Sequence, residues 1–435
     1  MIDIATKKIA GEISISSPIQ EEVGKSLHSM EDFRTIFHKQ EQGDVTQSLS
    51  LLLASALHLD VSDVHLEPEE TGIAIRFRVD GILQEATRID LEQFQTLLSR
   101  IKLLSGLKLN VEGRPQDGRF TLLSPDPIEI RVASLPSEHG ESIVLRVLNP
   151  KRLVLLSDLG LREDLEKLFR KEIQRTHGMI LVTGPTGSGK TTTLYSFLKE
   201  VQKAEVKVIT IEDPIEYHLE GVSQTQTDEA KGYTFASGLR AIVRQDPDIV
   251  LVGEMRDKET AEIALQAALT GHLVFSTLHA NDAPSTISRL LSLEANPVNI
   301  ASALRIAIAQ RLVRKVCKDC SVMETPTEKE LGIIQEGLKN IALNPLPIIN
   351  EKTLVPRAVG CPSCHNTGYR GRVGIFEAMR GGEELESVIE KSSSPVAIRA
   401  FAIKQGMIPL YQDGLLKILN GVTTLEEVRR VAQEE

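Results

Sequence analysis

The sequence predicts an α/β protein with a small α+β domain before its core and a cysteine module and helices after it. Three observations favour this class. Apolar strand-like runs alternate with helical runs between residues 161 and 310, which is typical of a parallel sheet. Residues 44–148 mix helical segments with alternating apolar segments. Beyond the core, four cysteines stand in two C-x-x-C pairs.

Composition indicates a folded protein of several domains. The chain has 435 residues, of which 41% are hydrophobic and 25% charged, and no apolar run of transmembrane length occurs in it. The N-terminal segment lacks the apolar stretch of a secretory signal, so we expect a cytoplasmic protein. The net charge of −10 gives no overall positive field for a phosphate backbone, which disfavours nucleic acid as a partner.

The pattern divides the chain into six parts. Residues 1–43 have no sustained period and are expected to form a weakly structured arm or a small helical lead-in. The α+β domain spans 44–148, with helices expected at 48–57 and 91–109 and strands at 73–79, 118–123, 128–136 and 141–148. A linker at 149–160 leads to the α/β core at 161–310, the cysteine module at 311–378 and a helical tail at 379–435.

Within the core, the elements alternate. Strands are expected at 179–184, 206–213, 248–254 and 273–279, and helices at 190–201, 258–269 and 283–293. A further helix is expected over the apolar stretch 300–316, and two helical stretches over 386–404 and 415–433.

A phosphate-binding loop follows the first core strand. The segment from Gly184 to Thr191 matches G-x-x-x-x-G-K-[ST] between a strand and a helix, the context that this motif requires. Its backbone N–H groups and Lys190 are expected to hold ATP phosphates, and Thr191 to bind Mg²⁺. A glycine-rich turn without a ligand is the alternative. The predicted nucleotide-binding residues are Gly184, Pro185, Thr186, Gly187, Ser188, Gly189, Lys190, Thr191 and Thr192.

Polar side chains follow three other core strands. Glu212, Asp213 and Glu216 come after one, Glu254 after another and His279 after a third. Because open parallel sheets bind ligands beyond the carboxyl ends of their strands, these side chains are expected to face the phosphate loop. A helix cap or a satisfied polar group is the alternative for each residue alone.

Hydrolysis needs a carboxylate for the attacking water and oxygen ligands for Mg²⁺, and Glu212 and Glu254 are the candidates. Gly253 stands where an aspartate usually precedes such a glutamate. Contacts to Mg²⁺ are therefore expected through Thr191 and water.

These segments resemble the secretion ATPase family that drives type II secretion and type IV pili. VRQDPDIVLVGEMRD (243–257) is similar to a signature of that family, IEDPIEY (211–217) to its aspartate box and TGHLVFSTLHANDA (270–283) to its histidine box. The resemblance implies a RecA-like P-loop ATPase core after a PAS-like α+β domain. It also implies a homo-hexamer that acts on an inner-membrane platform protein at the inner face of the cytoplasmic membrane.

The resemblance also implies roles for single residues. Glu212 would be the general base, Glu254 would assist Mg²⁺ and water, and His272 and His279 would sense the γ-phosphate. Arginines of the α+β domain reach the nucleotide in that family, and the matching positions are Arg114, Arg119 and Arg131. A solvated strand face is the alternative for each arginine.

The cysteine pairs are expected to bind Zn²⁺. The ligands would be Cys317, Cys320, Cys361 and Cys364, whose four thiolates leave no open position, as in a structural site. A redox-active C-x-x-C is the alternative, but it gives no reason for a second pair. His365 is left out of the ligand set. Assembly and export motors of the family commonly carry both pairs, whereas retraction motors generally lack them.

The sequence therefore favours an ATPase that powers type IV pilus assembly or type II secretion. A nucleic-acid translocase or DNA-uptake ATPase is the alternative, which the acidic composition and the absence of aromatic stacking positions disfavour. An ATP-binding scaffold without activity is disfavoured because Lys190, Thr191, Glu212 and Glu254 are all in place.

Overall fold

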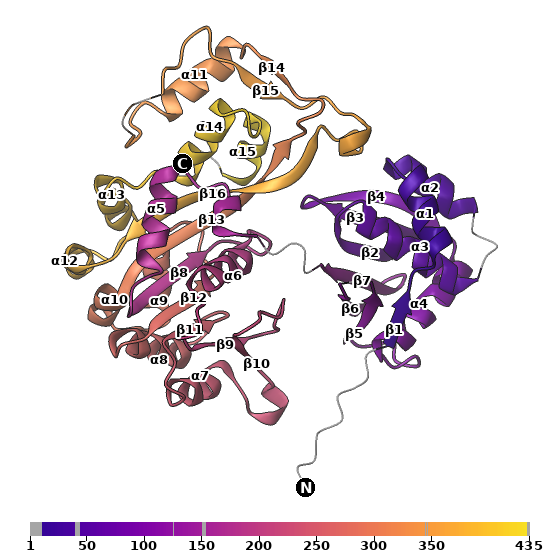
Figure 1. Cartoon of the computed structure of the whole chain (residues 1–435), viewed down its shortest axis with the longest axis horizontal. Coiled ribbons are helices and arrows are strands. Elements are labelled where there is room, and N and C mark those ends of the chain that lie inside the picture. The colour runs from indigo at the N-terminus through magenta and orange to yellow at the C-terminus, as the bar shows by residue number, and fades with distance from the viewer. Residues whose placement is uncertain are drawn as a thin grey trace. The chain divides into compact units, whose positions relative to one another are not determined.

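The computed structural model describes residues 11–39, 44–124, 126–149, 154–343, 345 and 347–432 (Figure 1). The chain forms two compact units, one of residues 1–152 and 359–370 and the other of residues 153–358 and 371–435. No helix in these described ranges is long and apolar enough to cross a membrane.

The first unit is a seven-stranded sheet with helices packed on it. The strand order is β1-β5-β6-β7-β2-β3-β4, with β1 parallel to β5 and the other pairs antiparallel. Alternate side chains such as Ile73, Ile75 and Phe77 enter a single core. The elements are β1 (Gly11–Ser14), α1 (Ser17–Ser26), α2 (Met30–Lys39), α3 (Val45–His58), β2 (Val61–Glu69), β3 (Gly72–Val79), β4 (Ile82–Ile89), α4 (Leu91–Ser105), β5 (Gln116–Leu123), β6 (Ile128–Ser137) and β7 (Gly140–Leu148).

The predicted N-terminal arm is partly integrated into this unit. Residues 1–10 and 40–43 lie outside the described residues, but residues 11–39 form β1, α1 and α2. Ile13 on β1 and Phe33 on α2 are buried in the core of the unit. The spaced apolar residues of this short segment therefore have tertiary partners that its own periodicity did not reveal.

The second unit is built around another seven-stranded sheet, in the order β10-β9-β11-β12-β8-β13-β16. Strand β8 (Gly178–Thr183) is parallel to β12 (Leu273–Leu278) on one side and to β13 (Leu304–Val316) on the other. Met179 and Leu181 of β8 enter one core, and Ile180 and Val182 enter another. Burial on both faces explains why these strands are apolar throughout.

Helices connect these strands and extend to the end of the described chain. The remaining elements are α5 (Glu163–Glu172), α6 (Lys190–Val201), β9 (Val208–Glu212), β10 (Ser223–Gln226), α7 (Phe235–Val243), β11 (Ile249–Val252), α8 (Lys258–Leu269), α9 (Ser285–Ser292), α10 (Pro297–Ala303), β14 (Val322–Glu324), α11 (Glu328–Gly337), β15 (Val355–Arg357), β16 (Tyr369–Arg380), α12 (Glu383–Lys391), α13 (Pro395–Lys404), α14 (Leu410–Leu419) and α15 (Leu425–Val431), with short 3-10 turns at Leu156–Asp158, Glu229–Lys231 and Pro362–Cys364.

The predicted α/β class is confirmed, but the helix expected at 300–316 is wrong. Only α10 is helical there, and β13 begins at Leu304. The run from Ile306 to Ala309 is fully buried, between a strand partner on each side and a core on each face. Periodicity alone does not distinguish such a central strand from a buried helix, which is why the prediction failed.

Candidate active site

The phosphate loop connects β8 to α6 and depends on glycine at its first and sixth positions. Gly184 and Gly189 have φ of 150° and 88°. A β-carbon on Gly184 would lie 2.5 Å from the hydroxyl of Ser188 and 2.6 Å from the backbone oxygen of Gln310. Because both residues need positive φ, which L side chains rarely adopt, glycine is required there.

The loop has polar groups that fit nucleotide phosphates. The Oγ atom of Ser188 is buried without a hydrogen-bond partner. Lys190 Nζ donates to the carbonyls of Gly184 (2.8 Å) and Pro185 (3.0 Å), so its ammonium group is held against the loop. Burial lowers the pKa of Lys190, while the charge of Glu254 acts in the opposite direction. A partly desolvated cation and an unsatisfied hydroxyl beside a helix N-terminus suit a bound phosphate.

Glu254 and His279 come together at the same edge of the sheet. His279 Nε2 lies 3.7 Å from one carboxylate oxygen of Glu254, and Arg256 pairs with the other oxygen at 2.5 Å. The ends of β11 and β12 are joined because Thr277 Oγ1 donates to the Gly253 carbonyl at 2.7 Å. Burial and the charge of Lys190 lower the pKa of His279, which favours a neutral imidazole at pH 7.

Glu212 has a different environment, although it also ends a strand. It is only 3% exposed. The Tyr195 hydroxyl donates to one of its oxygens, and Thr210 Oγ1 (2.6 Å) and Gln224 Nε2 (3.2 Å) donate to the other. Burial and this carboxylate together raise the pKa of Tyr195 far above its ordinary value. Both oxygens of Glu212 are therefore occupied by neutral donors of the chain.

The two predicted histidines do not lie together. His272 precedes β12, where its ring Nδ1 lies 3.0 Å from the carbonyl of Ala267, and His279 follows the same strand. A strand of this length spans about 20 Å. His272 thus lies at the N-terminal end of β12, whereas the phosphate loop of its own chain lies at the C-terminal ends of the parallel strands.

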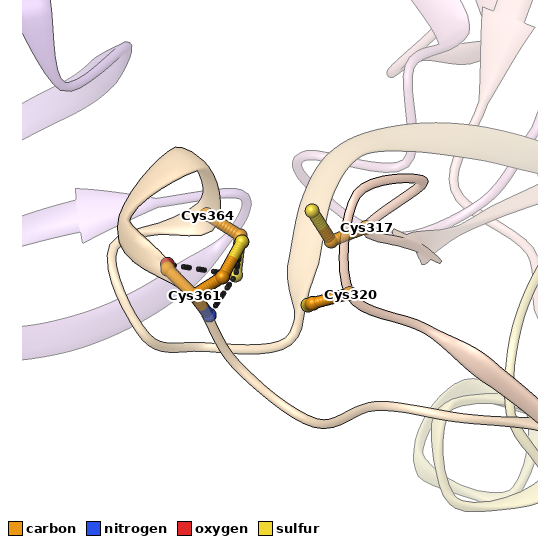
Figure 2. Close-up of side chains that lie close together, drawn as sticks. All are labelled: Cys317, Cys320, Cys361 and Cys364. Atoms are coloured by element: carbon orange, nitrogen blue, oxygen red, sulfur yellow. Dashed lines mark hydrogen bonds between the residues drawn. The ribbon is translucent and has the colours of Figure 1, made fainter.

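The four cysteines form a compact cluster. Their sulfur atoms all lie within 4.8 Å of one another, with Cys317 and Cys320 beyond the end of β13 and Cys361 and Cys364 on a short turn (Figure 2). The sulfurs of Cys361 and Cys364 are 3.8 Å apart. Thiolates bound tetrahedrally at about 2.3 Å from zinc would be about 3.8 Å apart, so the geometry fits.

Backbone groups also favour thiolates in this cluster. The N–H groups of Cys361 and Gly368 each donate to the sulfur of Cys364 at 3.2 Å. Such donors stabilise negative charge on sulfur, which metal ligation requires. The cluster holds the four predicted cysteines and not His365.

Comparisons with known proteins agree with this geometry. A family model described as type II/IV secretion system protein matches residues 38–430. The chain belongs to this family. It is 43% identical to the type II secretion system protein E of Pectobacterium carotovorum subsp. carotovorum, over 94% of this chain and 80% of that protein. It is 38% identical to the type IV pilus assembly ATPase PilB of Myxococcus xanthus, over 97% of this chain and 76% of that protein.

A solved structure supports the same assignment of this secretion ATPase. The pilus retraction motor PilT with bound ADP is similar with a TM-score of 0.58 and 26% identity, over 88% of this chain and 96% of that one. The predicted family, the predicted ATPase activity and the predicted function in the type II secretion and type IV pilus assembly class are thereby confirmed.

The predicted arginines of this secretion ATPase belong to the first unit, which is described separately from the phosphate loop. Arg119 and Arg131 both pair with Glu129, at 3.2 and 3.1 Å, on the facing strands β5 and β6. Arg114 is exposed in the loop before β5. Their predicted contact with nucleotide stays a prediction.

Sequence reasoning missed three residues that contact Glu212 or the phosphate loop. Tyr195 on α6 contacts Glu212, and Gln310 and Arg311 on β13 lie behind Gly184. The available signal is the Gln310-Arg311 pair, which interrupts an apolar run, but a helix over 300–316 gives this pair no place at the site. On the central strand β13, Gln310 contacts Thr193 in the first turn of α6, and Arg311 lies beside Gly184.

Proposed function

We propose that this secretion ATPase is the motor that converts ATP hydrolysis into pilus assembly or type II secretion, through movement of a platform protein in the inner membrane. The observation that carries the proposal is the convergence of Lys190, Glu254 and His279 at one edge of the sheet, in a chain of this family. A homo-hexamer at the inner face of the cytoplasmic membrane is part of the proposal. In such a ring, positive charge at the nucleotide would come from Arg114, Arg119 and Arg131. The γ-phosphate would be sensed by His272 of a neighbouring subunit.

The roles at the phosphate loop follow from its chemistry. Residues 184–192 would hold the phosphates of ATP through backbone N–H groups and Lys190, and Thr191 would hold the accompanying Mg²⁺, which neutralises charge on the phosphate oxygens. Glu254 is partly accessible and would orient the attacking water. His279, neutral and beside Glu254, would donate to or accept from the γ-phosphate region.

The proposed role of Glu212 as general base requires a change from the arrangement described here. A base must offer a free oxygen to water, but both oxygens accept from Tyr195, Thr210 and Gln224. We propose that this network holds Glu212 until the site closes on ATP. The charges that act on the pKa of Lys190 here are those of Glu254, Arg311 and, more weakly, Glu216, and not that of Glu212.

We propose that the ion held by the cysteines is Zn²⁺ and that its role is structural. Four sulfur ligands leave no position for substrate, and thiolates select zinc over the harder cations that bind carboxylates. The module from 311 to 378, together with the core at 161–310 and the tail from 379, remains our proposed division of this part of the chain.

The test is steady-state ATPase activity with Mg²⁺, measured beside oligomer mass by native mass spectrometry. Glu254→Gln and Lys190→Ala should abolish turnover and leave the fold and mass unchanged, because both act on phosphate chemistry and not on the core. Glu259→Gln is the control, since this exposed acid pairs with an exposed Arg240 on another helix. Normal turnover in either site variant would refute the assignment of the site. Stimulation of turnover by DNA would favour the translocase alternative.

A further inference from the structure

We propose that Arg311 is a positioning residue of the ATP site, which fixes the segment carrying His279 against the phosphate loop. The inference rests on the proposed function, because it assumes that His279 acts there. Arg311 lies on β13, the neighbour of the phosphate-loop strand β8. Its guanidinium lies between the phosphate loop and the segment that carries His279, and the reaction needs these two segments at a fixed distance.

The contacts of Arg311 define this bridge. Its Nη2 donates to the backbone carbonyl of Asn281 at 2.6 Å, two residues after His279. Its Nη1 donates to the carbonyl of Gln310 at 3.0 Å. A β-carbon on Gly184 would lie only 3.1 Å from the same Nη1, so the guanidinium lies against the first residue of the phosphate loop.

A second anchor holds the same segment from the other side. The hydroxyl of Thr183, the last residue of β8, has one proton, and the carbonyls of Leu278 (2.9 Å) and Ala280 (3.1 Å) both lie within its reach. It also accepts from the N–H of Ala280 at 2.8 Å. The residues on both sides of His279 are thus tied to the strand that leads into the loop. Arg311 adds the tie at Asn281, so the imidazole projects from a segment fixed at both ends.

The strand end that carries Arg311 is itself fixed to the helix of the loop. Gln310 is 1% exposed, and its side-chain oxygen accepts from Thr193 Oγ1 on α6 at 2.7 Å. A displacement of α6 on nucleotide binding would therefore reach Arg311 through Gln310. The connection links phosphate loop, β13 and the His279 segment in one rigid set.

The charge of Arg311 indicates a role beyond packing. It forms no ion pair with any carboxylate in the part of the chain that the structure describes, although its side chain is half-buried. Burial lowers its pKa, and its charge also lowers the pKa of Lys190. The charges of Glu377 and Asp282 oppose this lowering from beyond ion-pair distance, and a planar fork that bonds two carbonyls is a geometry that lysine does not reproduce.

The experiment compares Arg311→Met and Arg311→Lys with the matched control Arg305→Met. Arg305 lies on the same strand at the other edge of the sheet, has no ion pair among the described residues, and makes only a 3.5 Å contact with the carbonyl of His177. For each variant of the full chain we would measure kcat and KM for ATP, ADP affinity by calorimetry, and melting temperature. The cycle is completed by His279→Ala and by the double variant of Arg311→Met with His279→Ala.

We expect kcat to fall about 10- to 100-fold in Arg311→Met, as misplacement of a catalytic group by about 1 Å can produce. KM and ADP affinity should stay within about threefold, and Arg305→Met should match wild type. Arg311→Lys keeps the charge but not the fork, so it should lose kcat by several-fold, and it carries the test if Arg311→Met fails to fold. The double variant should be no slower than His279→Ala alone, because Arg311 acts through His279.

Three results would overturn the inference. The first is kcat within about twofold of wild type in both Arg311 variants. The second is a parallel fall of kcat, ADP affinity and melting temperature, which a purely structural role would give. The third is multiplication of the two losses in the double variant. Normal kcat in His279→Ala overturns the role of His279 as well, whereas loss in His279→Ala beside normal kcat in Arg311→Met overturns this inference alone.

Discussion

Glu427→Gln should destabilise the protein in a way that depends on pH. The Glu427 carboxylate on α15 accepts from the backbone N–H of Arg314 (2.9 Å), from the Arg314 guanidinium (2.7 Å) and twice from Arg430 (3.1 and 2.7 Å). Burial alone would raise the pKa of Glu427, but the bonds from Arg430 and Arg314 outweigh it and hold the pKa at about 2, against an ordinary 4.5. The carboxylate thereby ties α15 to β13.

The magnitude follows from the two pKa values. The difference between 4.5 and about 2, at about 1.36 kcal/mol per pKa unit, corresponds to about 3 kcal/mol. Because Arg430 is partly exposed to water, screening reduces this stabilisation to about 2 kcal/mol. Because the folded-state pKa lies below the unfolded one, the stabilisation is complete above about pH 5 and is lost as the pH falls towards 2. At pH 3 less than about 1 kcal/mol should remain.

The assay is urea unfolding at pH 7 and pH 3, followed by circular dichroism because the chain has no tryptophan. Glu427→Gln should lower the free energy of unfolding by about 2 kcal/mol at pH 7 and by much less at pH 3. The control is Glu336→Gln, which removes an exposed acid 3.3 Å from an exposed Lys339 and should change stability by at most about 0.5 kcal/mol. Equal losses for Glu427→Gln at the two pH values, or none at pH 7, would refute the reasoning.

Two further predictions concern the cysteine cluster and Glu212. A chelator should lower the melting temperature of the wild-type chain but not that of Cys361→Ser, which lacks a ligand already; unchanged melting of the wild type would contradict a structural metal. Tyr195→Phe keeps the buried ring and removes one donor to Glu212, so it should lower the free energy of unfolding by about 1.5 to 3 kcal/mol in urea titrations. A change below about 0.5 kcal/mol would mean that the hydroxyl does not hold the carboxylate.

Local patterns predicted the fold around the phosphate loop, where one segment contains all of its determinants. The phosphate loop, the strand before it and the helix at 190–201 follow from a run of about twenty residues, and α6 spans Lys190–Val201 as predicted. The four cysteines were predicted as one cluster from their spacing and chemistry. In the phosphate loop the residues that decide the structure are neighbours in the sequence, whereas the cysteine cluster joins two local C-x-x-C pairs that are forty residues apart.

Prediction failed where the deciding contacts come from distant segments. The sequence of β13 predicts a helix because apolar residues fill both of its faces. It forms a strand because it lies between β8 and β16 in the sheet. The predicted helix also hid the position of Arg311, because only as a residue of β13 does it lie next to β8, the strand that leads into the phosphate loop. The strand at 61–69 was also missed, because Pro68 and the charged residues along it hide an alternating pattern.

Glu212 and Glu254 show why a shared local pattern does not define a shared role. Each follows an apolar strand in a motif of the family, yet distant residues set their environments. Tyr195 on α6 and Gln224 on β10 donate neutral hydrogen bonds to the Glu212 carboxylate. Glu254 instead lies beside Arg256 and His279, two side chains that can also interact with a phosphate. Loss of activity on replacing Glu212 therefore does not by itself assign it a chemical step, because the same change removes the acceptor that three donors share.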